Sequence, residues 1–185
     1  MAEIRTIAVI GAGTLGREIA YASVLGGYRT ILEDILPASL RNAAAELRDQ
    51  LARAADLGSV SGAEANAAFT RLEYAATVEQ AAREADLVIE AVPDEMESKI
   101  EIFTLLDKIC RPATILASNT SALSVTEIAS VTYRAPKVLG MRFANGPATK
   151  QLEIVRGRET SDETIAACAE VARRLGTEVI VVADR

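Results

Sequence analysis

A glycine-rich turn near the N-terminus constrains the fold of this chain more than any other feature. Gly11-Ala-Gly13-Thr-Leu-Gly16 follows an apolar, β-branched run at residues 6–10 and opens a helical pattern at residues 13–25. Glycines at this spacing permit a tight turn from strand to helix, close approach of a ligand to the backbone and close helix packing. The turn therefore predicts a βαβ unit in which the free N–H groups of a helix N-terminus favour an anion.

Short β-branched runs alternate with longer helical patterns along the rest of the 185 residues. This alternation is typical of a doubly wound, Rossmann-type α/β fold, a mostly parallel sheet with helices on both faces. We expect strands at 6–10, 29–34, 71–74, 87–92, 114–117, 138–143, 152–155 and 178–182. We expect helices at 13–25, 37–57, 78–84 and 96–109, and two more that begin at capping boxes at 124–127 and 160–163. Gly58 and Gly62 mark a loop, and residues 1–185 are expected to form one domain.

Composition excludes several classes of function. The chain has no histidine, which excludes histidine metal sites and catalytic Ser–His or Cys–His pairs, and we expect no metal. Its net charge of −6 and the lack of a Lys/Arg cluster argue against a nucleic-acid partner. No apolar run approaches the roughly 20 residues of a membrane helix, so no membrane partner is expected. Cys110 and Cys168 are far apart and form no CxxC pair, which favours reduced thiols and a cytoplasmic protein.

An acidic residue closes the second predicted strand and defines the expected ligand. In dinucleotide-binding folds, a carboxylate at the position of Asp34 accepts the ribose hydroxyls of the adenosine half. It would repel a 2′-phosphate, and neither Ile35 nor Leu36 supplies an arginine to receive one, so the sequence favours NAD over NADP. The predicted cofactor-binding residues of this part are Gly11, Gly13, Thr14, Leu15, Gly16 and Asp34. A flavin, or a glycine-rich turn beside an incidental acidic residue, remains an alternative.

Three further segments extend the pattern. Ala-Asp-Leu-Val-Ile-Glu-Ala-Val at 85–92, Ser118-Asn-Thr-Ser121 and Gly140-Met-Arg-Phe-Ala-Asn145 occur in this order. Together with the glycine turn they resemble the N-terminal NAD-binding domain of the L-3-hydroxyacyl-CoA dehydrogenase family, over nearly the whole chain. The resemblance implies an oxidoreductase of fatty acid metabolism that transfers a hydride between a 3-hydroxyacyl-CoA substrate and NAD. The family's C-terminal helical domain is not part of this chain, and a homodimer is expected if such a domain follows.

The resemblance also implies roles for individual residues. It places four residues along the nicotinamide half of NAD, namely Ala91, Asp94, Lys99 and Asn145. Ser121 matches the serine that hydrogen-bonds the substrate oxygen, and Ser118 and Asn119 fit the turn that presents it. Glu153 matches the glutamate that holds the family's catalytic histidine.

Arg142 stands where the family has that histidine. Arginine keeps its proton at physiological pH, because its pKa exceeds about 12, so it cannot serve as the general base. A lost acid/base group typically costs about 10² to 10⁴ in rate, so the activity is expected to be impaired or altered. One alternative is a dehydrogenase of a small or carrier-bound hydroxy acid, with Arg142 binding an anionic group and Lys150 accepting the proton. Another is a degenerate NAD-binding or interaction module without chemistry.

Overall fold

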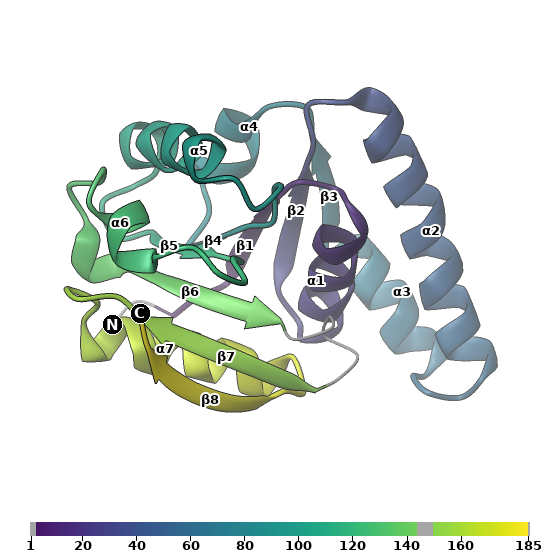
Figure 1. Ribbon diagram of the computed structural model, residues 1–185. Coiled ribbons are helices and arrows are strands. Elements are labelled where there is room, and N and C mark those ends of the chain that lie inside the picture. The colour runs from purple at the N-terminus through teal and green to yellow at the C-terminus, as the bar shows by residue number, and fades with distance from the viewer. Residues whose placement is uncertain (1–2, 144–149, 185) are drawn as a thin grey trace.

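The computed structural model describes residues 3–143 and 150–184. These residues form an eight-stranded sheet with helices on both faces (Figure 1). The strand order is β3-β2-β1-β4-β5-β6-β7-β8. The first six strands run parallel in the order of a dinucleotide-binding sheet, β7 is antiparallel to β6, and β8 is parallel to β7. The predicted Rossmann-type α/β fold is confirmed.

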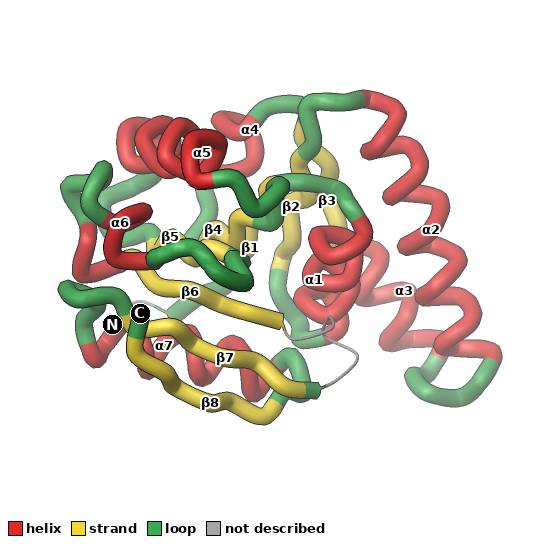
Figure 2. The backbone as a smooth tube through the Cα atoms, in the orientation of Figure 1, coloured by secondary structure: helices red, strands yellow, loops and turns green. Residues whose placement is uncertain are grey.

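The helices and strands follow the expected alternation closely (Figure 2). The strands are β1 (Thr6–Ile10), β2 (Arg29–Glu33), β3 (Leu72–Ala75), β4 (Leu87–Glu90), β5 (Ile115–Ser118), β6 (Val138–Phe143), β7 (Gln151–Arg156) and β8 (Glu178–Ala183). The helices are α1 (Thr14–Leu25), α2 (Pro37–Asp56), α3 (Gly62–Thr70), α4 (Val78–Ala82), α5 (Met96–Ile109), α6 (Val125–Ala129) and α7 (Asp162–Arg174), with a 3-10 turn at Ala135–Lys137.

The structure corrects the prediction at two helix starts. The glycines at 58 and 62 bound only a short turn, because Ser61 and Glu64 form a reciprocal capping box that starts α3. Helix α7 begins one residue later than expected, because its N-cap is Ser161 and not Thr160. The Ser161 hydroxyl accepts a hydrogen bond from the Thr164 N–H. The Thr160 hydroxyl instead donates to the Val138 carbonyl, within the core.

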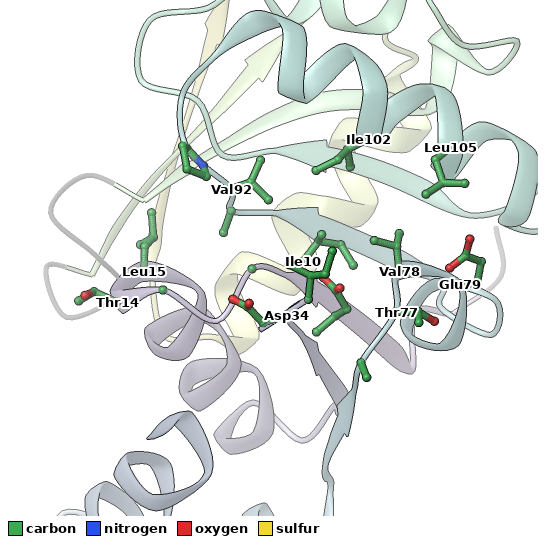
Figure 3. A pocket seen from close by; sticks show the side chains of 17 residues that line it. Ile10, Thr14, Leu15, Asp34, Thr77, Val78, Glu79, Val92, Ile102 and Leu105 are labelled. Atoms are coloured by element: carbon green, nitrogen blue, oxygen red, sulfur yellow. The ribbon is translucent and has the colours of Figure 1, made fainter. Parts of the chain in front are cut away.

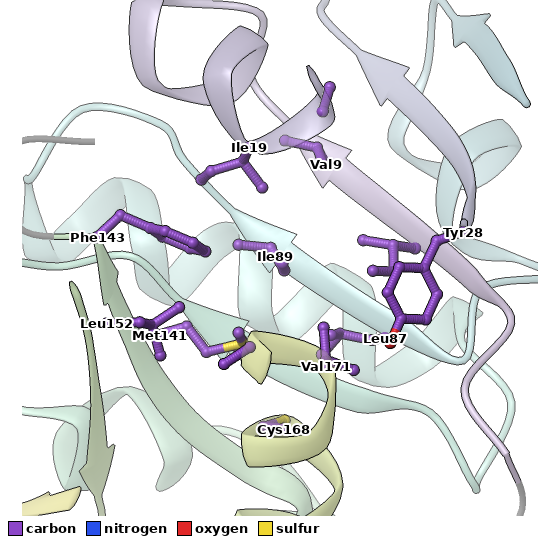
Figure 4. Packing of buried hydrophobic residues seen from close by; sticks show 14 of the residues in the cluster. Val9, Ile19, Tyr28, Leu87, Ile89, Met141, Phe143, Leu152, Cys168 and Val171 are labelled. Atoms are coloured by element: carbon purple, nitrogen blue, oxygen red, sulfur yellow. The ribbon is translucent and has the colours of Figure 1, made fainter. Parts of the chain in front are cut away.

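Two apolar layers hold the helices against the sheet. Helices α1, α2 and α7 cover one face, where the core includes Leu47 of α2. Figure 4 shows Ile19 and Val171 in the same cluster. Helices α4, α5 and α6 cover the other, and Phe103 from α5 is fully buried there. Both cysteines are buried and unpaired, as the sequence predicts. No helix in the described part of the chain is long and apolar enough to cross a lipid bilayer.

Candidate functional site

A cleft of about 800 Å³ opens at the carboxyl ends of β1, β2 and β4 (Figure 3). Strands β2 and β3 lie on one side of β1, and β4 and the later strands lie on the other, so the strand order switches sides between β1 and β4. Ligands of open α/β sheets bind at such a switch point. Thr14 and Leu15 lie at one end of the cleft, and Thr77, Val78 and Leu105 lie at the other, with Asp34 between them. The cleft is therefore elongated along the strand ends, as an extended ligand requires.

The glycines of the turn keep one end of this cleft open. A Cβ on Gly16 would lie 1.8 Å from the Gly11 carbonyl oxygen, so only glycine allows α1 to pack this close to β1. Gly11 has a φ of 101°, which favours glycine, and a Cβ there would meet the Ala91 carbonyl at 3.0 Å. Gly13, the N-cap of α1, has no atom within 4 Å of an added Cβ. A diphosphate can thus reach the free N–H groups of α1 over Gly13, and the loop fits that group.

Asp34 is held in place by the backbone around it. Its Oδ2 accepts a hydrogen bond from the Ala12 N–H at 2.9 Å, and its Oδ1 accepts one from the Leu36 N–H at 2.9 Å. A carboxylate offers about four acceptor positions, so two remain for ligand hydroxyl groups. Ile35 and Leu36 are 80% and 60% exposed and carry no charge, so the following residues provide no cation for a 2′-phosphate.

A second acidic residue, Glu33, lies beside Asp34 and lines the same cleft. Its side chain is only 4% exposed. Burial, followed by the neighbouring charge of Asp34, raises the pKa of Glu33 to about 7 against a partial opposing effect of the Gly11 N–H. Close to neutral pH this group therefore exchanges between the carboxylate and the neutral acid.

A buried ion pair lies under the other side of the cleft. Lys99 Nζ lies 2.8 and 2.9 Å from the two oxygens of Glu90, and both side chains are 0% exposed. The Ser118 hydroxyl and the Val92 N–H also donate to this carboxylate. Burial raises the pKa of Glu90, although Lys99, Ser118 and the Val92 N–H act to lower it. This network ties the ends of β4 and β5 to helix α5.

Asp94 links that network to the turn after β5. Its Oδ2 accepts hydrogen bonds from the Ser121 hydroxyl at 2.7 Å and the Ser121 N–H at 3.0 Å, and its Oδ1 lies 3.7 Å from Lys99 Nζ. Burial acts to raise the pKa of Asp94, but the hydrogen bonds from Thr120 and Ser121 and the charge of Lys99 lower it overall. The Ser121 hydroxyl is thereby fixed by a carboxylate.

Arg142 and Glu153 form an ion pair across β6 and β7. The antiparallel register sets the two residues opposite each other, and Arg142 Nη1 donates to Glu153 Oε2 at 2.9 Å. The Arg142 Nε also donates to the Thr120 carbonyl at 2.8 Å. Both side chains are about one-third exposed, at 29% and 34%. The guanidinium group is thus neutralised by Glu153 and anchored beside Ser121.

Ser121, Arg142 and Glu153 line a second, polar hollow of about 320 Å³. Asp184 also lines this hollow, and its carboxylate accepts hydrogen bonds from the Ser124 hydroxyl and from the N–H groups of Val125 and Thr126. Burial acts to raise the pKa of Asp184, but these donors lower it overall. Asp184 therefore fastens the end of β8 to the start of α6, next to Ser121.

The structure gathers the residues singled out in the sequence into two adjoining places. The larger cleft is lined by Gly11, Gly13, Thr14, Leu15, Asp34 and Ala91, with Gly16 packed beneath it. The polar hollow brings together Ser121, Arg142 and Glu153. Asp94 connects the two, whereas Lys99 is buried below the cleft and does not line it. Asn145 lies outside the described residues, and Lys150 lines neither place.

Sequence reasoning missed Glu33 and Glu90. Both end short apolar strands, and Ile10 of β1 pairs with both in register. Val88 and Ile31 point to the α4–α5 face, so the residues two positions further along point there too. An acidic residue at the end of a buried strand was the signal that could have drawn attention to each of them.

Comparison with known proteins gives a consistent result. The family model described as "3-hydroxyacyl-CoA dehydrogenase, NAD binding domain" matches residues 6–185. A probable 3-hydroxybutyryl-CoA dehydrogenase of Bacillus subtilis is 40% identical over 98% of this chain. The crystal structure of (S)-3-hydroxybutyryl-CoA dehydrogenase from Ralstonia eutropha superposes with a TM-score of 0.94 at 33% identity, over 99% of this chain. A diketoreductase structure superposes with a TM-score of 0.90 at 30% identity, over 98% of this chain.

The chain spans only part of these relatives. It covers 63% of the Bacillus subtilis protein and 65% of each of the two solved chains. The remaining third of each relative has no counterpart in these 185 residues.

Proposed function

Because the chain belongs to the 3-hydroxyacyl-CoA dehydrogenase family, of which it forms the NAD-binding domain, we propose that residues 1–185 supply the cofactor-binding domain of an oxidoreductase acting on 3-hydroxyacyl-CoA. The observation that carries the proposal is the direct adjacency of the two sites through Asp94. Asp94 directly follows Pro93, which lines the cleft, and its carboxylate accepts a hydrogen bond from the hydroxyl of Ser121, which lines the polar hollow. A substrate oxygen beside Ser121 would thus lie next to one end of the bound cofactor.

In this proposal the chain holds NAD along the whole cleft. The N–H groups at Gly13, Thr14 and Leu15 face the diphosphate, with Gly11 and Gly16 shaping the turn, and Asp34 receives the adenosine ribose hydroxyls. Ala91 and Asp94 adjoin the nicotinamide half, and Lys99 acts from below by fixing Asp94. Bound NAD supplies the oxidising equivalent for a secondary alcohol.

The residues around the substrate would orient it more effectively than they would move its proton. The Ser121 hydroxyl donates its hydrogen to Asp94, so its oxygen can accept a hydrogen bond from a substrate hydroxyl, and it can donate to a substrate carbonyl once the bond to Asp94 rearranges. The Arg142 guanidinium can polarise a carbonyl but cannot remove a proton. We therefore expect carbonyl reduction and alcohol oxidation by this chain to be slow in comparison with a relative that has a histidine there.

One observation favours a second candidate, an NAD-binding module without chemistry. Arg142 stands at the position of the family's acid/base group and is held there by hydrogen bonds to Glu153 and to the Thr120 carbonyl. The same pairing weakens the alternative in which Arg142 binds an anionic hydroxy acid, since Glu153 already neutralises it and would repel that anion.

Two glycine variants test how the loop binds NAD. Gly13→Ala is expected to lower the unfolding midpoint only slightly, because the added Cβ meets no atom within 4 Å and only the poorer N-cap of alanine acts against folding. It is expected to weaken NAD binding by filling the approach to α1. Gly16→Ala is expected to lower both stability and NAD affinity, because its Cβ would lie 1.8 Å from the Gly11 carbonyl oxygen. Calorimetric titration and thermal unfolding of each variant separate the effects. Unchanged NAD affinity in Gly13→Ala would show that the dinucleotide does not cross this loop.

The proposed function is tested by binding and turnover together. NAD is expected to bind the parent, and Asp34→Ala is expected to weaken it by about tenfold or more, because charge-assisted hydrogen bonds to the ribose are lost. Asp56→Ala, at the exposed end of α2, is the matched control. NADH oxidation with acetoacetyl-CoA, compared with small 3-oxo acids, then tests the substrate class. This assay uses the chain joined to the C-terminal part of the Bacillus subtilis relative, because the chain covers 63% of that protein. If NAD binds and neither class of substrate is turned over, the second candidate, an NAD-binding module without chemistry, is supported instead.

A further inference from the structure

Glu33 and Glu90 occupy equivalent places in the sheet but have opposite surroundings. Each ends a parallel strand, each pairs with Ile10 of β1, and each points to the α4–α5 face. Glu90 has a full set of partners, which are Lys99, Ser118 and the Val92 N–H. Glu33 has no cation beside it, and no Lys or Arg is among the described residues that line the cleft. The Glu90 carboxylate is therefore bound by groups of the protein interior, whereas the Glu33 carboxyl group can accept hydrogen bonds from a ligand in the cleft.

The walls around Glu33 suit a flat ring. On the far side of Asp34 from the glycine turn, the apolar side chains of Ile10, Val78, Ile102 and Leu105 line the cleft, together with Thr77 and Glu79 at its end (Figure 3). Since Asp34 stands at the ribose position of the adenosine half, the base belongs in this apolar part. Buried polar groups in such a pocket fix the orientation and identity of a ligand. Glu33, at 4% exposure, is such a group.

We propose that the Glu33 carboxyl group reads the base of the bound dinucleotide, accepting a hydrogen bond from the 6-amino group of adenine and rejecting a 6-oxo purine. An ionised carboxylate can only accept hydrogen bonds. The 6-amino group donates, whereas the 6-oxo group of hypoxanthine is itself an acceptor and would be repelled. A site that pairs a buried polar group with one ligand rejects the analogue that leaves it unpaired.

The protonation of Glu33 makes this selectivity depend on pH. With a pKa of about 7, the group is ionised at about pH 8.5 and largely neutral at about pH 6. The charged groups that face it are Asp34 at the end of its own strand and Glu79 on α4, while the Gly11 N–H faces it from the β1–α1 turn. The neutral acid gains an O–H donor, which a 6-oxo group can accept. Selectivity for adenine is therefore strongest above the pKa of Glu33.

The experiment compares NAD with nicotinamide hypoxanthine dinucleotide by calorimetric titration of the full chain. At about pH 8.5 we expect the hypoxanthine form to bind roughly tenfold or more weakly, since a hydrogen bond to a charged group is lost and a repulsion is added. At about pH 6 the ratio of the two Kd values is expected to fall. In Glu33→Gln the ratio is expected to approach 1 at both pH values, because an amide can turn to donate or accept.

Glu79→Gln removes the same charge from the same cleft and serves as the matched variant. At about pH 8.5, where Glu33 is ionised in both proteins, the ratio is expected to stay near the parent value in Glu79→Gln. A ratio near 1 in the parent at both pH values, or a ratio that persists in Glu33→Gln, would overturn the proposal. So would a ratio that collapses in Glu79→Gln instead.

The proposal rests on NAD binding and not on the reaction, so the two can fail separately. If NAD itself does not bind the parent, the cofactor assignment falls and base reading falls with it. If NAD binds and the parent ratio is near 1, only the role of Glu33 falls. Should Glu33→Gln not fold, the parent ratio and its decrease at low pH decide the matter alone.

Discussion

Replacing Lys99 by methionine is expected to lower the free energy of unfolding by about 3–5 kcal/mol, the usual cost of removing one partner of a buried ion pair. Lys99 Nζ contacts both oxygens of Glu90, and neither side chain is exposed. Methionine fills a similar volume, so the loss reports the unpaired charge and not a cavity. Urea unfolding at neutral pH measures the effect.

The sign of the pH dependence provides a second check. Burial already raises the pKa of Glu90 while Lys99 acts to lower it, so Lys99→Met raises that pKa further. A carboxyl group whose pKa is raised by folding costs stability as the pH rises from its unfolded to its folded pKa. The deficit of Lys99→Met against the parent is therefore expected to be larger at about pH 8 than at about pH 5.

Two variants isolate the origin of the loss. Lys108→Met changes an exposed lysine on the same helix and is expected to alter stability by less than about 0.5 kcal/mol. The double variant Lys99→Met/Glu90→Gln removes the unpaired charge and is expected to recover part of the deficit. A deficit equal in the single and double variants would show that packing by Lys99, and not its charge, stabilises this region.

Most helices and strands of this fold could be predicted because each is marked by residues that are close together in the sequence. A short β-branched run predicts a buried parallel strand, and the spacing of apolar residues alone predicts the helix at Met96–Ile109. Helix α3 escaped notice because Gly58 and Gly62 dominate that stretch, while its capping box, Ser61 with Glu64, is the decisive signal. The start of α7 moved from Thr160 to Ser161 because the Thr160 hydroxyl is used by a distant strand.

The candidate site was predictable only in part, because its partners are distant in sequence. The glycine turn and Asp34 lie within one βαβ unit, so their spacing is informative. The pairing of Arg142 with Glu153 depends on the register of an antiparallel strand pair, and the pairing of Glu90 with Lys99 depends on how α5 packs. No spacing rule contains that information, so the sequence does not show that the Lys99 side chain is buried against Glu90.

Replacing Arg142 by histidine is expected to raise the rate of acetoacetyl-CoA-dependent NADH oxidation by about 10² to 10⁴, the usual contribution of a placed acid/base group. The cross-strand register would set the imidazole opposite Glu153, within reach of the carboxylate that now binds the guanidinium group. An imidazole with a pKa near 6.5 can both take and give a proton at neutral pH, which arginine cannot. The assay uses the chain joined to the C-terminal part of the Bacillus subtilis relative, of which the chain matches 63%.

Arg158→His, which changes an exposed arginine that lines neither the cleft nor the polar hollow, is the matched control and is expected to leave the rate unchanged. If Arg142→His gains no activity while NAD affinity stays at the parent value, the surrounding groups are not arranged for proton transfer. Ser121 would then be held by Asp94 for structural reasons alone, and the chain would bind the cofactor without using it. A gain would mean the opposite, that the hollow retains its catalytic geometry and that Arg142 alone limits the reaction.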